Sequence, residues 1–459
     1  MPSHDRNQKK FILPIPKCPP GGEPLRDEDV SAVAELAYVW GWALVNVANR
    51  TKLAQHFANG KPLLVEGMPI GYGSFTMQTE FSSPNERIIC CPTHDGLYGG
   101  GAFDLGTTGV VFQVPEFPAG QQWLYSLYDA RTDQYGSYRQ GTEKGFYLIV
   151  PQNWNPANNP DPSVFDDNHR MTCDTNRTFN VARIFMKNPP TSDQIPDWLK
   201  YVNFYPAQNY NRQWQPGPWG NVEDLSCPLP PLPHEMKYVR PWTFLEDLSA
   251  VLQTVPAQDD YEKDLYYSFT KLIDLARADG LVRRECRRMF REIELTTIQG
   301  YMQWKTNGPV AGNGWYTSID SAEWKTHEYT YRTATAKSNL FQNRPVDTRY
   351  YFTDTDTNSR PLDGGTTYSI TFYDGLPPAQ GPSSVTVYSQ SHFLYEDPFS
   401  VSLNGLAGNP ITIYAGPEPP LPDCQWMRTP PNEPFSLYLR AYWMPDLFRP
   451  WVPPKIAKY

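Results

Sequence analysis

The sequence has little of what usually assigns a function at first sight. Its seven cysteines are odd in number and show no two-residue spacing of the zinc-site kind, so neither a disulfide framework nor a zinc cassette is predicted. Lysine and arginine (40) are fewer than aspartate and glutamate (49), which excludes a basic footprint for nucleic acid. No glycine-rich phosphate loop, dinucleotide fingerprint or Gly-x-Ser-x-Gly elbow occurs. Kinase, Rossmann-type and common hydrolase classes are therefore disfavoured.

Long apolar runs are also scarce. The most apolar stretch, residues 36–45, spans about ten residues, whereas a membrane-spanning helix needs about 20. Residues 1–27 are rich in lysine and proline, but their apolar core, residues 11–13, is too short for a secretory signal. We expect an extended arm here and a soluble protein without a membrane span. It would be cytoplasmic as written, and periplasmic or secreted if a leader was trimmed.

Proline and aromatic residues are abundant instead. The chain has 47 prolines and 14% aromatic residues but only 19% charged residues, a mixture typical of many short strands joined by proline-rich loops. A chain of 459 residues also exceeds what one hydrophobic core normally serves, so two domains are expected. The predicted fold class is mainly β with helices (α+β).

Hydrophobic periodicity divides the chain into four parts. Helical spacing follows residue 29, period-two alternation follows residue 67, helical spacing returns at 243–302, and strands return after residue 329. At the start of the second helical part, Thr243 and Glu246 predict a capping box. Residues 151–240 are rich in proline, asparagine and tryptophan and predict long ordered loops. The expected parts are an arm (1–27), a helix plus β-domain with aromatic loops (28–240), a helical segment (241–328) and a second β-domain (329–459).

Several short motifs recur in the order of a known pair of domains. They are AYVWGW at residues 37–42, DGLY at 95–98, LYDA at 127–130, GFYLIV at 145–150, LDG at 362–364 and PFSLYLRAY at 434–442. With these motifs the chain resembles proteins that combine the domains of unknown function 1254 and 1214. The resemblance implies two β-sandwich or jelly-roll-like domains bridged by helices, the second at 329–459, and it implies no settled activity.

The chain departs from that family at several positions. Family members usually read Asn-Asp-Thr where this chain has His94-Asp95-Gly96, and they usually carry Phe-Trp near Pro382 and Ser383. They also usually have an arginine shortly after the position of Pro398. The last two departures argue against a substrate shared with the family, whereas His94 is a gain that would add acid–base capacity at neutral pH.

The glycine-rich turn at residues 90–100 (CCPTHDGLYGG) concentrates titratable groups between two apolar segments. Asp95 is a candidate general base or metal ligand, or else a turn former whose carboxylate accepts its own backbone amides. His94 is a candidate acid–base partner, or an exposed side chain of the turn. Tyr98 either orients a substrate or caps the core. Since three polar side chains in one turn are costly to bury, we expect them at the mouth of a concave site.

The other thiol and metal candidates are weaker. Cys90 and Cys91 are adjacent in a segment expected to be extended, so at most one of them can face His94, and buried structural thiols are favoured. Asp354, Asp356 and Asn358 imitate the start of a calcium loop, but the glycine and glutamate that such a loop needs later are missing. A hairpin turn is predicted there, and no metal site is assigned.

Four further residues are candidates for substrate binding. Arg139 can hold a carboxylate in bidentate fashion or form an ion pair at the rim. Arg440 and Tyr442 share the polar face of one predicted strand, which either lines a cleft or meets the other domain; the domain contact is favoured. Tyr128 lies in the LYDA motif on a predicted strand.

Two function classes follow. The first is an enzyme acting on a small, apolar or aromatic molecule in a cleft lined by tyrosine and tryptophan. Asp95 would be the base, His94 its partner, and Tyr98 or Arg139 the orienting group; hydrolytic or lyase-type chemistry of this kind needs no organic cofactor. The second is a non-catalytic ligand-binding or assembly protein, in which the aromatic loops at 198–242 hold a ligand or another subunit. The sequence leaves substrate, cofactor and a homo-oligomeric state open.

Overall fold

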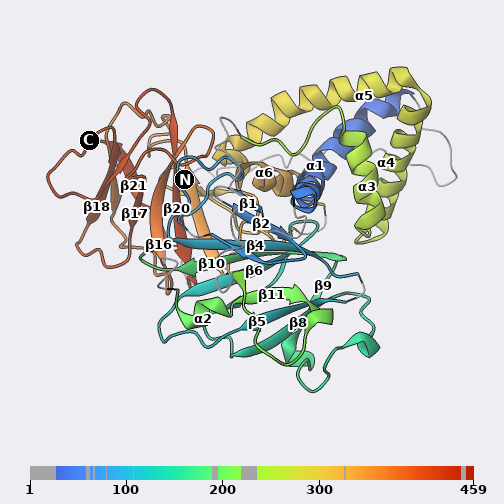
Figure 1. Ribbon diagram of the computed structural model, residues 1–459. Helices are drawn as coiled ribbons and strands as arrows, with labels where there is room; N and C mark the ends of the chain where they lie inside the picture. Colours follow the sequence, from blue (N-terminus) through green and yellow to red (C-terminus); the bar gives the residue numbers. More distant parts are fainter. Residues whose placement is uncertain are drawn as a thin grey trace, which may run out of the picture.

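The computed structural model describes residues 27–57, 63–65, 68–78, 80–106, 108–188, 195–218, 235–324, 327–445 and 451–459. It has two β-sheet regions separated by a helical segment, as expected from the sequence. Figure 1 shows the helices over one face of the first β region and the second β region beside both. The predicted arm lies outside the described residues except for Asp27, and so do residues 219–234 of the predicted aromatic loops.

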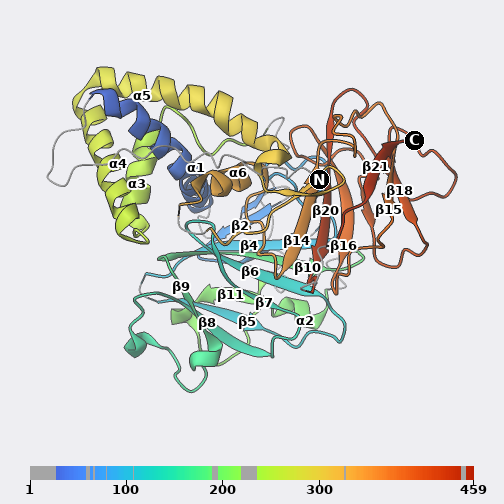
Figure 2. The same ribbon diagram turned by 180° about the vertical axis from the view of Figure 1, so that it is seen from behind.

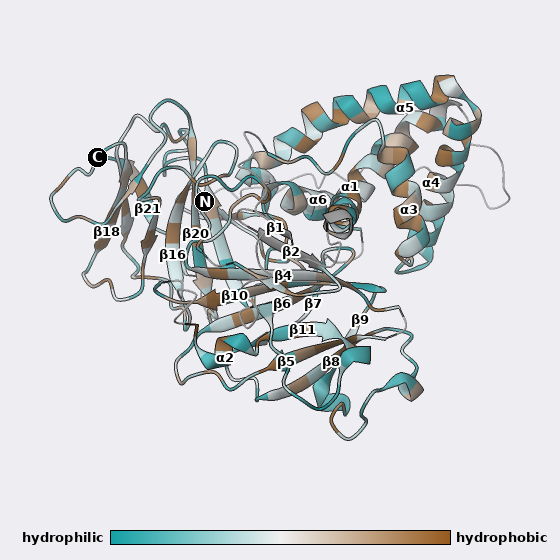
Figure 3. Cartoon of the chain, viewed as in Figure 1, coloured by the Kyte–Doolittle hydropathy of each residue, from teal (hydrophilic) through white to brown (hydrophobic). Residues whose placement is uncertain are grey.

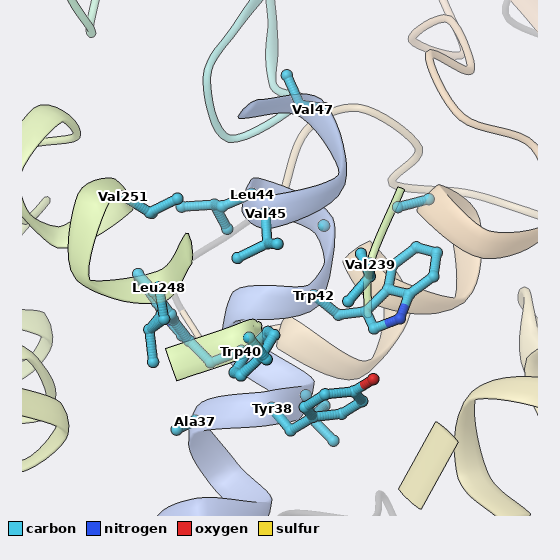
Figure 4. Packing of buried hydrophobic residues seen from close by; sticks show 14 of the residues in the cluster. Ala37, Tyr38, Trp40, Trp42, Leu44, Val45, Val47, Val239, Leu248 and Val251 are labelled. Atoms are coloured by element: carbon cyan, nitrogen blue, oxygen red, sulfur yellow. The ribbon is translucent and has the colours of Figure 1, made fainter. Parts of the chain in front are cut away.

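A long apolar helix forms the centre of the helical layer. This helix, α1 (Asp27–Phe57), packs against α3 (Phe244–Thr254), α4 (Asp260–Ala278), α5 (Gly280–Ile293) and α6 (Tyr329–Ser338). Because it is apolar on nearly all sides, it must be covered all round, and Trp40 and Tyr38 are fully buried (Figure 4). Where α1 meets α3, a Cβ on Gly41 would lie 2.9 Å from Leu248 Cδ1, so the Leu248 side chain would have to shift to admit one.

The polar edges of the buried aromatic residues in α1 are satisfied by two glutamates. Glu294 accepts hydrogen bonds from the Tyr38 hydroxyl (2.8 Å) and the Trp42 indole (2.9 Å), and Glu262 accepts one from the Trp40 indole (3.1 Å). Among the described residues, only the stretch Asp29–Ala54 of α1 is long and apolar enough to cross a membrane, and 83% of its most apolar window is buried inside the protein. Figure 3 shows the contrast with α5, along which hydrophilic and hydrophobic residues alternate.

The first β region is built from two sheets. The larger sheet has the order β1-β2-β4-β10-β6-β7, with β3 also on β4, and the smaller has the order β11-β5-β8-β9. The strands are β1 (Leu63–Val65), β2 (Met68–Tyr72), β3 (Thr76–Met77), β4 (Gly96–Asp104), β5 (Val110–Val114), β6 (Trp123–Asp129), β7 (Gln134–Arg139), β8 (Gly145–Pro151), β9 (Arg170–Cys173), β10 (Arg177–Phe185) and β11 (Asn203–Pro206). The short helix α2 (Asp197–Lys200) precedes β11. The two sheets share one aromatic core, in which Phe112 stacks on Phe204 with ring centroids 4.1 Å apart.

The larger sheet is buried on both faces. Alternate residues of β10 point to opposite sides, so that Ala182 and Ile184 join the core between the sheets while Phe179 and Val181 join the core under α1. The expectation of long loops at 151–240 is therefore wrong for β10, which lies in the middle of the sheet. A strand buried on both faces lacks the apolar–polar alternation that reveals a half-exposed strand, which explains why the pattern did not predict it.

The second β region is also built from two sheets, with the orders β12-β13-β14-β20-β16-β17 and β19-β18-β15-β21. Its strands are β12 (Val310–Gly312), β13 (Trp315–Thr317), β14 (Thr348–Thr353), β15 (Tyr368–Phe372), β16 (Ser383–Ser389), β17 (Ser400–Ser402), β18 (Ile411–Gly416), β19 (Trp426–Arg428), β20 (Phe435–Tyr442) and β21 (Lys455–Lys458). Val385, Leu439 and Ile413 belong to the apolar core between these sheets. Figure 2 shows β14, β20 and β16 next to the ends of β4 and β10, where the two β regions meet.

Candidate functional site

The turn singled out by the sequence is a contact between the two β regions. The Cys91 amide donates to His392 O (2.8 Å), and the Tyr388 hydroxyl donates to Pro92 O (2.6 Å). The Arg440 guanidinium donates to Cys91 O (2.6 Å). Three groups of the second β region thus form hydrogen bonds with the backbone of Cys91 and Pro92, two consecutive residues of the first. We call residues 90–95 the clasp segment.

His94 and Asp95 complete this contact. Asp95 Oδ2 accepts hydrogen bonds from Thr93 Oγ1 (2.7 Å) and from Ser384 Oγ (2.6 Å) of β16. The His94 ring stands edge-on between Phe81 and Phe399, with centroids 5.1 and 4.9 Å away, and its Nδ1 lies 3.0 Å from Ser82 O. Both side chains are half-buried. Asp95 therefore points to the second β region and His94 lies between the two regions, and neither lines the cavity described below.

Tyr98 differs from its two neighbours in the turn because it is buried. It lies on β4, 7% exposed, and its hydroxyl accepts a hydrogen bond from the Thr93 amide (2.9 Å). The expected position at the mouth of an open site is not found for Tyr98; it lines an internal cavity instead. The alternation of β4 explains the difference, since Tyr98 points to the face that α1 and the second β region cover.

The two cysteines are buried, as favoured from the sequence, but not in an extended segment. Cys91 has φ = 55°, in the left-handed region, so the expected alternation of the two side chains does not apply. Burial raises the pKa of the Cys90 thiol to about 12, and the pKa of Cys91 is raised for the same reason. Neither thiol is activated as a nucleophile.

The four predicted substrate-binding residues also lie where the two β regions meet. Arg139 forms an ion pair at the rim with the buried Asp347 (3.5 Å), one of the two alternatives considered for it. Tyr128 is fully buried and donates to Phe341 O and Asn343 Oδ1, both at 2.8 Å. Arg440 makes the expected domain contact, and Tyr442 packs edge-on against a ring of β10, Phe185, with centroids 4.6 Å apart. The calcium-like residues 354–365 form the expected hairpin turn, closed by Thr355 and Pro361.

Arg183 of β10 lies at the centre of this contact. It was not identified from the sequence as a candidate site residue. It is 6% exposed and donates to Asn343 Oδ1 (3.0 Å), Ser126 Oγ (3.4 Å) and Phe341 O (3.3 Å). It is the register partner of Tyr98, and its guanidinium lies 5.5 Å from the centre of the Tyr98 ring. A single arginine inside the apolar run VARIF was the signal in the sequence, because a charge within a buried strand is rare unless it is paired or functional.

Arg183 and Arg440 are both buried, and neither has a carboxylate within 4.0 Å among the described residues. One buried carboxylate of this interface, Asp347, pairs with Arg139, and the partners of Asp95 are hydroxyl groups. The tyrosines do not supply the missing charge: burial raises the pKa of Tyr442 well above its ordinary value against the opposing effect of Arg183. Two guanidinium groups therefore lie in the interface without an ion-pair partner in the part of the chain that the structure describes.

A small cavity adjoins Arg183. Its volume is about 20 Å³, and it is lined by Ile89, Cys90, Cys91, Pro92, Tyr98, Val181, Arg183, Asn339, Leu340 and Phe341. Arg440 does not line the cavity itself but donates to the carbonyl of Cys91, which does. Its second terminal nitrogen, Nη1, is buried and has no hydrogen-bond partner among the described residues. A cavity of this size holds one or two water molecules or a group of similar size. We call it the arginine cavity.

The fold and this interface define a two-domain α+β protein in which Arg183 of the first β region and Arg440 of the second are buried where the two regions meet. Residues 72–206 match the model of a family described as a protein of unknown function (DUF1254), and residues 347–446 match that of DUF1214. The chain therefore carries both domains, which confirms the resemblance noted in the sequence. Neither description states an activity.

Two solved structures resemble the chain over most of its length. The VPA0106 protein from Vibrio parahaemolyticus is 17% identical, with a TM-score of 0.57 over 94% of this chain and all of that one, which shows a shared fold. A putative uncharacterized protein from Burkholderia cenocepacia is 10% identical, with a TM-score of 0.46 over 95% of this chain and 91% of that one. No curated protein matches the chain.

Proposed function

We propose that this protein is a small-ligand-binding protein that holds an anion in the arginine cavity, between its DUF1254 and DUF1214 domains. The observation that carries the proposal is the pair of buried guanidinium groups without a carboxylate partner. Leaving a buried charge unpaired costs several kcal/mol, whereas a hydrogen bond to a charged group contributes about 1.5–3 kcal/mol. A bound anion would offset that cost and tie the two domains together.

Non-catalytic binding fits the geometry better than catalysis. The groups from which acid–base chemistry was expected, His94 and Asp95, make contacts between the domains and do not face the arginine cavity. A hydrolase or lyase that uses Asp95 as its base stays the alternative predicted from the sequence. The two proposals differ in their test, because only the enzyme needs the charge of Asp95 for turnover.

Asn343 offers a direct test of the anion proposal. Its Oδ1 accepts from Arg183, Ser126 and Tyr128, so Asn343→Asp would place a carboxylate next to Arg183 with little change of shape. In sodium gluconate, whose anion is too bulky for the cavity, acetate added at constant ionic strength should raise the melting temperature of the wild type. The stabilisation expected is about 2.7 kcal/mol at 100 times the dissociation constant. Asn343→Asp should melt higher than the wild type in gluconate and should not respond to acetate.

The matched control is Asn158→Asp, which adds the same charge at an exposed position. This variant should respond to acetate as the wild type does. The proposal is wrong if the wild type shows no response to acetate beyond that to ionic strength, or if Asn343→Asp responds to the same extent as the wild type.

A further inference from the structure

A polar cleft lies between the helical layer and the first β region and is separate from the arginine cavity. Its volume is about 330 Å³, at the lower end of the range of about 300–1,000 Å³ that is usual for small-molecule sites. Figure 1 shows the end of α3 directed towards the β9 side of the first β region, and residues from both parts line the cleft. Among the described residues, none lines both this cleft and the arginine cavity. A ligand here would therefore be bound independently of the anion.

Two parallel strands of the first β region supply the polar side of the cleft. Pro151 at the end of β8 is the register partner of Cys173 at the end of β9. Because the carboxyl ends of parallel strands lie at the same edge of a sheet, the residues that follow them, Gln152 and Asp174, are neighbours at that edge, and both line the cleft. Asp174 is exposed and forms no ion pair in the part of the chain that the structure describes. The other amide side chains that line the cleft belong to Asn153, Asn176 and Gln253.

The end of α3 also lines the cleft, and it adds negative rather than positive charge. The last carbonyl groups of a helix have no intrahelical amide to accept from and carry the negative end of the helix dipole. Residues 252–254 are the last residues of α3, and all three line the cleft. A longer helix would offer Leu252 the amide of residue 256, but that residue is proline and has none. The loop that follows α3 is held in place by the Tyr266 hydroxyl, which donates to Val255 O (2.9 Å).

We propose that this cleft binds a small organic amine in its protonated form, with the ammonium group at Asp174. Among the described residues that line the cleft, Asp174 is the only charged one, and the end of α3 adds to its negative potential. A cation that donates N–H groups is complementary to these acceptors, whereas an anion would be repelled. Leu252, Ala257 and the ring of Tyr266 supply apolar surface for the hydrocarbon part of the ligand. The proposal does not depend on the anion in the arginine cavity.

The test is a ligand-observed NMR titration at pH 7 and constant ionic strength. The probes are benzylammonium chloride and, as a neutral molecule of the same shape, benzyl alcohol. Benzylammonium should bind the wild type at least about fivefold more tightly than benzyl alcohol does. Asp174→Asn keeps the shape of the side chain but removes its charge, and should weaken benzylammonium binding about fivefold, which corresponds to the upper value measured for solvent-exposed ion pairs.

The matched control is Asp374→Asn, which removes the same charge from an exposed aspartate of the second β region that does not line the cleft. This variant should bind benzylammonium as the wild type does. The proposal is overturned if benzylammonium does not bind, if benzyl alcohol binds as tightly, or if Asp174→Asn binds benzylammonium as the wild type does. An equal loss in Asp374→Asn would trace the effect to the net charge of the protein and overturn it as well. Because the two probes compared on the wild type can already refute it, the result does not depend on Asp174→Asn folding.

Discussion

Asp95 should connect the two domains energetically, and a double-mutant cycle with Ser384 measures that connection. Its carboxylate accepts hydrogen bonds from Thr93 in its own domain and from Ser384 in the other. Asp95→Ala leaves the buried Ser384 hydroxyl without its partner, which costs about 1–3 kcal/mol. Ser384→Ala removes one of two donors and leaves the half-buried carboxylate with Thr93. We therefore expect a coupling energy of about 1 kcal/mol between the two positions.

The assay is urea unfolding followed by tryptophan fluorescence for the wild type, both single variants and the double variant. The midpoint should shift while the slope stays the same, since the surface exposed on unfolding does not change. Asp95→Asn is the conservative control: it keeps an acceptor oxygen and should lose less stability than Asp95→Ala. A coupling energy below about 0.3 kcal/mol would refute the contact between the domains.

The same variant separates the two functions. If Asp95 is the base of an enzyme, Asp95→Asn should lower turnover of its substrate at least about 100-fold. If the clasp segment only joins the domains, Asp95→Asn should leave carboxylate binding unchanged.

Two further predictions concern buried titratable groups. Burial and the neighbouring Asp129 carboxylate raise the pKa of Asp133, so the folded state binds the proton more tightly than the unfolded state does. The stability that protonated Asp133 contributes is fully present below the ordinary carboxyl pKa of about 4. It is lost as the pH rises through the raised pKa of Asp133 in the folded protein. Asp133→Asn, which keeps the acceptor for the Trp324 amide, should flatten the fall in melting temperature on going from pH 5 to pH 8; an unchanged slope would contradict this reasoning. Because the pKa of Cys90 is about 12, only about one thiol in ten thousand is ionised at pH 8, and iodoacetamide followed by mass spectrometry should modify Cys90 in urea but not in the native protein. Rapid alkylation of native Cys90 would show that the segment opens.

The order of helical and β segments could be predicted because each follows from a local pattern. The apolar residues of α1 recur every three or four positions, and the strands of the second region alternate with period two, whatever they pack against. The capping box at Thr243 is a local prediction that was wrong, since its hydroxyl donates to Asp247 (3.0 Å) and caps no backbone amide. The sequence likewise showed that polar groups are concentrated at residues 90–100. It did not show which residues those groups contact.

Only the tertiary structure decided which side chains meet. Arg183 and Arg440 are 257 positions apart and come together because two sheets from different domains abut, which no spacing in the sequence encodes. The same packing turned Asp95 towards the second domain, placed His94 between the two β regions and buried Tyr98. Period and composition decide which face of an element is buried, whereas the contacts across that face depend on partners far away in the chain. For this protein the sequence by itself determined the order of the helical and β regions and the two domains, but not β10. The meeting of the two domains determined which side chains come together in the candidate site.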